Sequence, residues 1–134
     1  MNRTMLISIT TLSVFFGADV LPALAKEPSS VVSALDSDND QTLDLAEVKK
    51  AANDLFTTLE KDGDETLDAK ELKGRIDKKS LKVADPDSDK TVSRDEFQNY
   101  VEKIFKDADP DNDGTVDENE LSTKQGKSLQ RLIQ

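Results

Sequence analysis

Residues 109–120, DPDNDGTVDENE, carry six acidic side chains within twelve positions. Five of these acids stand at positions 1, 3, 5, 9 and 12, the sixth is Glu118 at position 10, and Gly114 stands at position 6. This spacing is typical of the loop of a helix–loop–helix metal-binding hand, whose oxygen ligands converge on one cation. Because a bound cation offsets the repulsion among carboxylates held so close together, the stretch predicts a metal site.

The same twelve-residue loop occurs four times, at 36–47, 60–71, 85–96 and 109–120, here called loops 1 to 4. Each copy has acids at positions 1, 3 and 5, Thr at 7, Leu or Val at 8 and Glu at 12. A single DxDxD string is common on protein surfaces. Four copies in register, each closed by Glu, instead indicate four EF-hand metal loops.

The loop positions have distinct chemical roles. Positions 1, 3 and 5 offer short carboxylates, position 7 offers its backbone carbonyl, and Glu at position 12 reaches back to bind with both oxygens. Because Thr at position 7 binds through its carbonyl, we expect its side chain to be free. Position 8 points away from the metal and suits a short strand pairing between loops. The ligands predicted from these positions are Asp36, Asp38, Asp40, Thr42 and Glu47; Glu60, Asp62, Asp64, Thr66 and Glu71; Asp85, Asp87, Asp89, Thr91 and Glu96; and Asp109, Asp111, Asp113, Thr115 and Glu120.

Departures from the pattern distinguish the loops. Position 6 favours glycine because its backbone has a positive φ. Gln41, Glu65 and Lys90 nevertheless occupy it in loops 1 to 3, and each is expected to destabilise its loop by about 1 kcal/mol. Loop 2 begins with Glu60 rather than Asp, and loop 3 has Ser93 at position 9 in place of an acid. These departures predict that loop 4 is the best formed, loop 1 the next, and loop 3 the weakest.

The linkers between loops, 48–59, 72–84 and 97–108, hold only 12 or 13 residues. Their apolar residues recur at the spacing of a helix, so each linker has room for about one helix, shared by two loops. In the middle linker Gly74 precedes Asp77, which is placed to cap a second short helix. The predicted fold is all-α: a compact small helical bundle with four EF-hand loops that share short linker helices, and short β-bridges between loops. We expect each loop to pair with a loop that is not its sequence neighbour, or in an unusual geometry.

The N-terminus has the features of a cleavable signal peptide. Residues 1–3 are a short basic region, residues 5–18 are mostly apolar, and Ala23-Leu24-Ala25 fits the small-x-small cleavage rule. The apolar run is too short and interrupted to span a bilayer comfortably. We therefore expect export, cleavage near Ala25, no stable membrane insertion, and one metal-binding domain at 26–134.

Charge and composition narrow the function. Without residues 1–25 the chain keeps 17 basic and 27 acidic residues, and 22 of those acids lie in the four loops, so the charge is not a general surface coat. A net charge of −10 favours cations over nucleic acid or anionic membrane as partners. The chain has no His and no Cys, and its acidic clusters are assigned as ligands, so we do not expect an enzyme. With one Tyr and no Trp the core is thin, and folding is expected to need a neutralising ion.

These features resemble the lanmodulin family, the periplasmic lanthanide-binding proteins of methylotrophic bacteria. The resemblance rests on four acidic hands with short linkers behind a signal peptide, and on TLDAKELKGR at 66–75 and DPDNDGTVD at 109–117. It also includes the C-terminal string S-x-x-x-G-x-x-L-x-x-L-I at 122–133. The family has Pro at position 2, which Pro86 and Pro110 match; Ser37 and Lys61 stand there in loops 1 and 2.

The resemblance implies a periplasmic protein that binds up to four lanthanide ions (La³⁺, Nd³⁺ or similar) in preference to Ca²⁺ and becomes ordered on binding. Its role would be capture, buffering or delivery in cells with a lanthanide-dependent alcohol dehydrogenase. A metal-dependent homodimer and a periplasmic partner that receives the metal stay open. The family's position-9 ligand falls on Asp44, Asp68 and Asp117, with Ser93 in its place in loop 3.

Ion charge gives a physical reason for this preference. Lanthanide ions have nearly the size of Ca²⁺ but half again its charge, and Coulomb attraction scales with ion charge while carboxylate repulsion does not. Four trivalent ions would take the net charge from −10 to +2, whereas four divalent ions would leave −2. Mg²⁺ should bind poorly because it needs a small octahedral site and keeps its waters.

Two other functions remain as alternatives. The motif alone favours an exported calcium-binding buffer or sensor, since most such hands bind Ca²⁺. A calcium-stapled interaction module of the dockerin kind also spaces its loops closely, but usually has two copies that close with Asp.

Overall fold

The computed structural model describes residues 30–134, and the predicted signal peptide lies outside this range. The described part is mainly helical, with short antiparallel β-pairings, as predicted for a small helical fold with bridges between loops. Among residues 30–134, no helix is long and apolar enough to cross a membrane. In chain order the elements are α1 (Ser30–Leu35), β1 (Leu43–Asp44), α2 (Leu45–Leu59), β2 (Thr66–Asp68), α3 (Lys78–Ala84), β3 (Thr91–Ser93), α4 (Arg94–Ala108), β4 (Thr115–Val116), α5 (Glu118–Leu121) and α6 (Lys124–Gln130).

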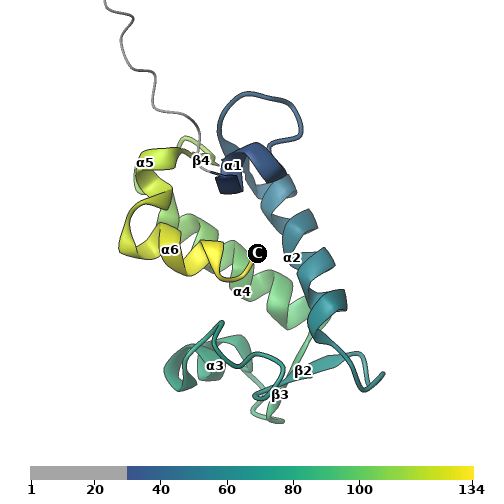
Figure 1. Ribbon diagram of the computed structural model, residues 1–134. Coiled ribbons are helices and arrows are strands. Elements are labelled where there is room, and N and C mark those ends of the chain that lie inside the picture. The colour runs from purple at the N-terminus through teal and green to yellow at the C-terminus, as the bar shows by residue number, and fades with distance from the viewer. Residues whose placement is uncertain (1–29) are drawn as a thin grey trace, which may run out of the picture.

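Helices α2 and α4 are the two long helices of the fold and pack against each other (Figure 1). They are the helices predicted in the first and third linkers, but each begins three residues earlier, inside the preceding loop. The reason is that position 9 caps the helix, so the helix starts at position 10. Their apolar faces meet in the core, where the rings of Phe56 and Phe97 lie 5.8 Å apart between centroids.

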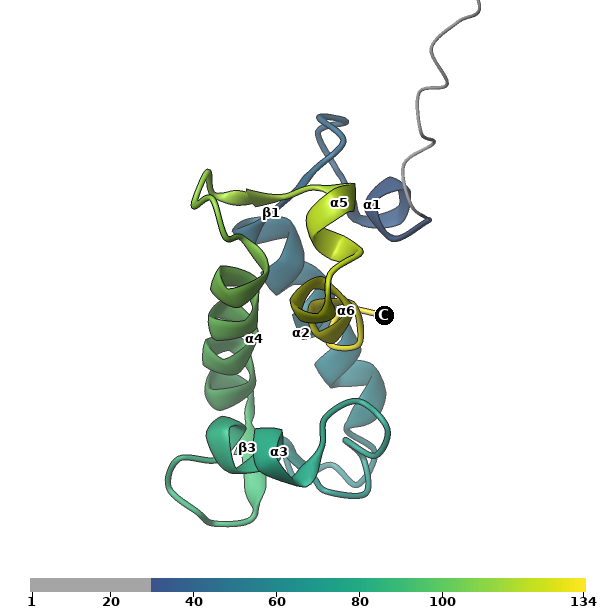
Figure 2. The same ribbon diagram turned by 90° about the vertical axis from the view of Figure 1, so that its left-hand side faces the viewer.

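The loops pair through their position-8 residues, as predicted. In the antiparallel pair β1–β4, Leu43 lies opposite Val116, and in β2–β3, Leu67 lies opposite Val92. All four side chains are fully buried. Because α2 leads from loop 1 to loop 2 and α4 from loop 3 to loop 4, the two loop pairs lie at opposite ends of the helix pair (Figure 2).

One pairing differs from the prediction. Loops 1 and 4 are not sequence neighbours, as expected, but loops 2 and 3 are neighbours and still pair. The prediction is wrong there because the middle linker is not one helix. Gly74 has φ +86°, and Asp77 caps the short α3 by accepting from Lys79 N–H at 2.9 Å and Ser80 N–H at 2.7 Å. The chain therefore turns back and brings loop 3 beside loop 2.

The C-terminal helix α6 closes the core against α4 and α5. Leu129 in α6 is buried, and so are Leu132 and Ile133 just after the helix. The approach of α6 to α5 is close enough that a Cβ on Gly126 would lie 2.1 Å from the Glu120 carbonyl oxygen. This contact seats α6 directly on the helix that follows loop 4.

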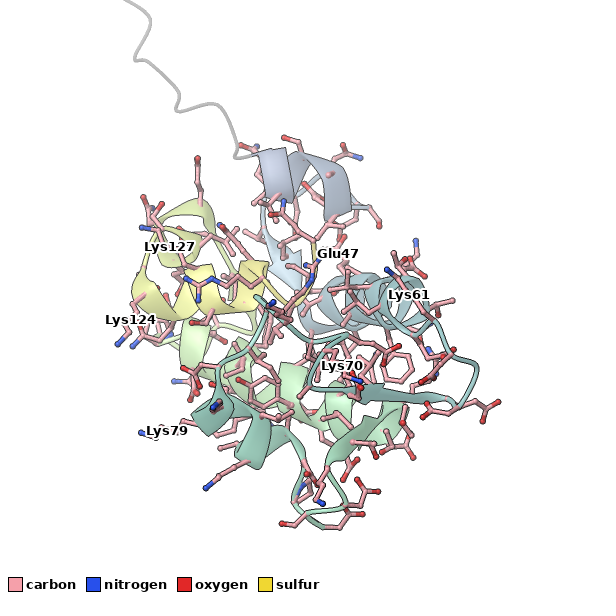
Figure 3. The ribbon with its side chains drawn as sticks, turned by 60° about the horizontal axis from the view of Figure 1, so that its bottom comes forward. Glu47, Lys61, Lys70, Lys79, Lys124 and Lys127 are labelled. Atoms are coloured by element: carbon pink, nitrogen blue, oxygen red, sulfur yellow. The ribbon has the colours of Figure 1, made fainter. Side chains whose placement is uncertain are left out.

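An ion-pair network links α2 and α4 on the surface. Glu102 accepts from Lys49 Nζ at 2.7 Å and from Lys106 Nζ at 2.9 Å. Hydrogen bonds from Lys106 and Lys49 lower the pKa of Glu102 from 4.5 to about 2. Other lysines, among them Lys79, Lys124 and Lys127, are exposed and extend outward from α3 and α6 (Figure 3).

Candidate metal centres

The backbone of every loop follows one path, set by two residues with positive φ. At position 6 these are Gln41, Glu65, Lys90 and Gly114, with φ of 70°, 65°, 79° and 92°, which confirms the expectation for this position. Position 4 also has positive φ in all four loops, which the sequence reasoning missed. The signal was present, because Asn39, Gly63 and Asn112 are of the types that adopt this conformation most readily, and Ser88 is the exception.

This path turns backbone N–H groups onto the acid at position 1. In loop 1, Asp36 Oδ1 accepts from Asn39 N–H at 2.6 Å and Oδ2 accepts from Gln41 N–H at 2.9 Å. In loop 2 the longer Glu60 accepts from Gly63 N–H at 2.5 Å, so it reaches the same place as Asp. The position-1 carboxylate is thus oriented by the loop itself.

Within each loop, three acids bring one carboxylate oxygen each to within 4.8 Å of the others. Loops 2, 3 and 4 converge through positions 1, 3 and 12, and loop 1 through positions 1, 3 and 5. Such groups can hold a metal ion, because hard cations take several carboxylate oxygens. The convergent residues are Asp36, Asp38 and Asp40; Glu60, Asp62 and Glu71; Asp85, Asp87 and Glu96; and Asp109, Asp111 and Glu120.

The position-7 threonines do more than predicted. In every loop, the Thr hydroxyl donates to the Oδ1 of the position-5 Asp at 2.7 or 2.8 Å, and the Thr backbone N–H donates to the same oxygen at 2.8 Å. The expectation that this side chain is free is therefore wrong. The Thr91 hydroxyl, followed by its N–H, lowers the pKa of Asp89, and Thr115 does the same for Asp113. Threonine thus orients the position-5 carboxylate and favours its charged form.

Position 9 lies beside the convergent clusters rather than in them. Asp44, Asp68 and Asp117 accept through Oδ1 from the backbone N–H of the position-12 Glu at 2.8 to 2.9 Å. Ser93 makes the same bond with its hydroxyl at 3.3 Å. Serine and aspartate are comparably good helix caps, so the change in loop 3 removes a charge and keeps the cap.

The position-12 glutamates are held in a reciprocal bond. Their Oε2 accepts from the backbone N–H of position 9 at 2.8 to 3.2 Å in all four loops. In loops 1, 3 and 4 the arrangement is a helix capping box, in which the cap and the Glu satisfy each other's backbone donors. Loop 2 has the same two hydrogen bonds between Asp68 and Glu71, at a turn rather than at the start of a helix. The reciprocal bond fixes the Glu side chain beside the loop through Oε2, so that Oε1 does not take part in this bond.

Asp109 supplies the clearest sign of a missing partner. It is 6% exposed, and its Oδ2 accepts from Gly114 N–H at 3.1 Å. Its Oδ1 is buried and has no hydrogen-bond partner within residues 30–134. A buried carboxylate oxygen without a donor is costly, and a cation in the convergent cluster would supply the interaction that it lacks.

The electrostatics of the clusters agree with this need. Burial raises the pKa of Glu120, and the neighbouring charges of Asp111, Asp117 and Asp109 raise it further. Desolvation and the adjacent position-5 carboxylate also raise the pKa of the position-3 acids Asp38 and Asp62. Neighbouring carboxylates in these clusters therefore disfavour each other's ionisation. Asp117 contributes to this effect in loop 4, although its side chain caps a helix.

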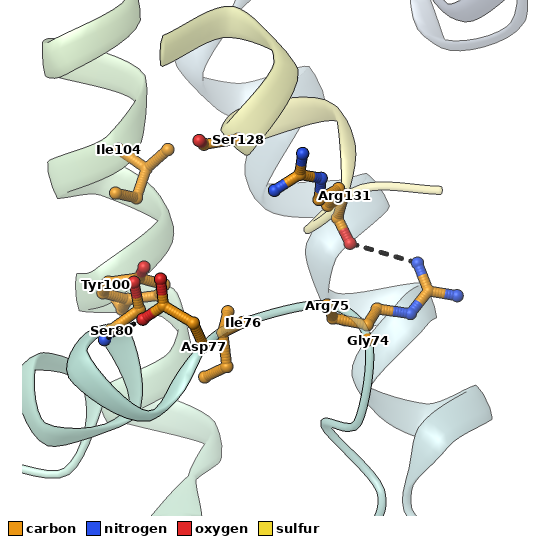
Figure 4. A pocket seen from close by; sticks show the side chains of 9 residues that line it. All are labelled: Gly74, Arg75, Ile76, Asp77, Ser80, Tyr100, Ile104, Ser128 and Arg131. Carbon is orange, nitrogen blue, oxygen red and sulfur yellow. Dashed lines mark hydrogen bonds between the residues drawn. The ribbon is translucent and has the colours of Figure 1, made fainter. Parts of the chain in front are cut away.

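A separate hollow of about 300 Å³ lies between residues 74–80, α4 and α6 (Figure 4). Arg75, Tyr100 and Arg131 are among its lining residues, and Arg75 Nη1 donates to the Arg131 carbonyl oxygen at 3.1 Å. Arg75 also donates to the Gln134 carbonyl oxygen, which ties the C-terminus to the middle linker. None of the four convergent clusters includes a residue of this hollow.

Comparison of the chain with protein-family models and with curated proteins finds no match in either. The four loops and their clusters are therefore the basis for a functional assignment.

Proposed function

We propose that this chain is an exported EF-hand protein of the lanmodulin kind, which binds trivalent lanthanide ions in the periplasm and acts by capture, buffering or delivery rather than by catalysis. The observation that carries the proposal is the buried Oδ1 of Asp109, which lies within a cluster of three acids and has no hydrogen-bond partner among residues 30–134. The same loop backbone and acidic pattern occurs four times, which supports up to four ions per chain.

The preference for a trivalent ion rests on charge density. Each cluster gathers three carboxylates whose oxygens lie within 4.8 Å of one another, and each loop has one more ligand-position acid outside its cluster, at position 12 in loop 1 and at position 5 in loops 2 to 4. Loops 1, 2 and 4 add a further acid at position 9. Carboxylate repulsion is the same whichever ion binds, while attraction grows with the charge of the ion. The position-9 acids need not bind the metal directly to contribute, since the charge of Asp117 already raises the pKa of Glu120.

Binding is proposed to be coupled to folding. The raised pKa values of the position-3 acids Asp38 and Asp62 mean that the folded chain disfavours their ionised forms, and this penalty grows as pH rises through those pKa values. A cation removes the penalty, so its binding free energy appears as folding free energy. Because the ligands must be ionised, metal affinity should fall as pH falls.

Calcium binding is the second candidate, because the same oxygen ligands suit Ca²⁺. An exported calcium buffer or sensor would have the same loops. The two candidates differ in the free-ion concentration at which the chain becomes ordered.

The test is a pair of titrations of metal-stripped protein, with helix content followed by circular dichroism in metal-buffered La³⁺ and Ca²⁺. The proposal predicts that helix forms at a free La³⁺ concentration many orders of magnitude below the free Ca²⁺ required. If both ions act in one range, or if only Ca²⁺ orders the chain, the calcium function replaces it.

A further inference from the structure

The residue at position 2 divides the four loops into two kinds. In loops 1 and 2, Ser37 and Lys61 have a backbone N–H that donates to Oε1 of the position-12 Glu; the Lys61 bond to Glu71 is 2.9 Å long. In loops 3 and 4, position 2 is Pro86 and Pro110, and proline has no N–H to donate. We call loops 1 and 2 the N–H loops and loops 3 and 4 the proline loops.

This difference changes how the position-12 Glu can meet an ion. In the N–H loops both of its oxygens accept backbone donors, one from position 2 and one from position 9. In the proline loops Oε2 is the one Glu oxygen that accepts a backbone donor from the part of the chain that the structure describes, from Ser93 N–H at 2.8 Å and from Asp117 N–H at 2.9 Å. An ion that engages both Glu oxygens therefore competes with the position-2 donor in the N–H loops and has no such competitor in the proline loops.

Loop 4 has a further advantage over loop 3. Both oxygens of Asp85 accept loop N–H groups, from Asp89 at 3.2 Å and from Lys90 at 3.0 Å. The buried Oδ1 of Asp109 in loop 4 has no such donor. An ion in loop 4 can therefore bind Asp109 Oδ1 without displacing a backbone N–H from it. The same holds for Oε1 of Glu120.

The β-pairing distributes the two kinds of loop evenly. Loop 1 pairs with loop 4 and loop 2 pairs with loop 3, so each end of the helix pair carries one N–H loop and one proline loop. In each pair the position-8 side chains meet in the core, Leu43 with Val116 and Leu67 with Val92.

We propose, on the basis of the proposed function, that ions bind in two stages: first to the proline loops, with loop 4 ahead of loop 3, and then to the N–H loops. This order keeps loop 4 first but places loop 3 ahead of loop 1, whereas the residue pattern alone predicted loop 3 to be the weakest. The backbone N–H at position 2 is the competitor that sets this order. Half-loaded protein would carry one ion at each end of the helix pair.

The order can be read by ¹H–¹⁵N NMR during a titration of metal-stripped protein with diamagnetic La³⁺. The amides of Gly114 in loop 4 and Gly63 in loop 2 are the reporters, one for each kind of loop. The chemical shift of the Gly114 amide is expected to reach its value in the metal-bound protein before that of the Gly63 amide begins to change.

Two variants of loop 2 separate the N–H from the side chain. Lys61→Pro removes both, while Lys61→Ala removes the positive side chain and keeps the N–H. A hydrogen bond to a charged group corresponds to about a ten- to hundredfold change in an equilibrium constant. Lys61→Pro should therefore increase the affinity of loop 2 for La³⁺ by that factor. Lys61→Ala shares the loss of the positive charge but keeps the N–H donor, so it should tighten La³⁺ binding to loop 2 by clearly less than Lys61→Pro.

Pro110→Ala gives the opposite test and does not depend on placing a new proline. It restores an N–H in loop 4 and should weaken that loop by about the same factor, with the Gly63 transition unchanged. If Gly63 and Gly114 shift together, or if Lys61→Ala acts as strongly as Lys61→Pro, the proposed order is wrong while lanthanide binding stands. If neither amide responds to La³⁺ but both respond to Ca²⁺, the proposed function fails as well.

Discussion

Replacing Asp109 by Asn is expected to stabilise the metal-free protein and to weaken its metal binding. Asp109 is 6% exposed, and only its Oδ2 has a donor, the N–H of Gly114 at 3.1 Å. Asn keeps the shape of the side chain and a carbonyl oxygen for the Gly114 bond. It removes the buried charge, whose Oδ1 has no partner in the described part of the chain.

The size of both effects follows from this environment. A buried polar group without a partner costs about 1–3 kcal/mol, so the free energy of unfolding of the metal-free variant should rise by about this amount. The substitution also removes one of three carboxylates whose oxygens lie within 4.8 Å of one another. Loop 4 should then bind La³⁺ about tenfold more weakly, or worse, because one unit of attraction is lost.

Urea denaturation in chelator measures the unfolding free energy, and the Gly114 amide in a La³⁺ titration measures the affinity. The matched control is Asp107→Asn, which removes the same charge two residues away. Asp107 is 48% exposed and pairs with Lys103 at the surface, so its loss should change either quantity little. If stability and affinity fall together in the Asp109 variant, or if the control behaves in the same way, the account of Asp109 is refuted.

Three further predictions concern the fold that holds the loops. Leu67→Ala should lower the unfolding free energy of loaded protein by about 2–5 kcal/mol, because Leu67 is fully buried. Val83→Ala, at a side chain that is 50% exposed, should change it by less than about 0.5 kcal/mol; equal losses in urea denaturation would contradict this. Gly126→Ala should cost about 1–3 kcal/mol, since its Cβ would lie 2.1 Å from a backbone oxygen, and an unchanged melting temperature relative to Gln125→Ala would argue otherwise. The lysines that lower the pKa of Glu102 to about 2 should stabilise the fold above pH 4.5, with this stability lost as pH falls from 4.5 towards 2. Glu102→Gln should remove that pH dependence. If the unfolding free energy of the variant falls with pH in parallel with that of the unaltered protein, the Glu102 network is not the cause of the pH dependence.

The sequence predicted the features that depend on local spacing. The acids of each loop, the buried residues at position 8, the positive φ at position 6 and the cap at Asp77 all follow from residue types at fixed separations. Local rules determine them because a turn, a cap or a short strand is decided by a few neighbouring residues.

Other features depend on geometry that spacing does not contain. The pairing of loops 2 and 3 depends on how sharply the chain turns at Gly74, and a linker length cannot give that angle. The hydrogen bond from the Thr91 hydroxyl to Asp89 depends on the loop backbone that brings the two side chains together, which residue spacing does not contain. The helix α1 was missed because six residues carry too little periodicity, although Val31 and Val32 are buried.

The role of position 9 is the most instructive difference. An acid there is compatible with both a metal ligand and a helix cap, and the chain has Asp in loops 1, 2 and 4 and Ser93 in loop 3. The structure uses Asp44, Ser93 and Asp117 as helix caps, which explains why serine fits, and Asp68 makes the same hydrogen bond at a turn that no helix follows. In loop 4 the charge of Asp117 acts on the cluster from outside it, since it raises the pKa of Glu120.

The most direct test of the central claim is equilibrium dialysis of the protein against a low concentration of La³⁺ with a large excess of Ca²⁺, followed by elemental analysis of the bound ions. The account predicts that each chain retains several La³⁺ ions and little Ca²⁺. Retention of Ca²⁺ with La³⁺ at or below one ion per chain would contradict it.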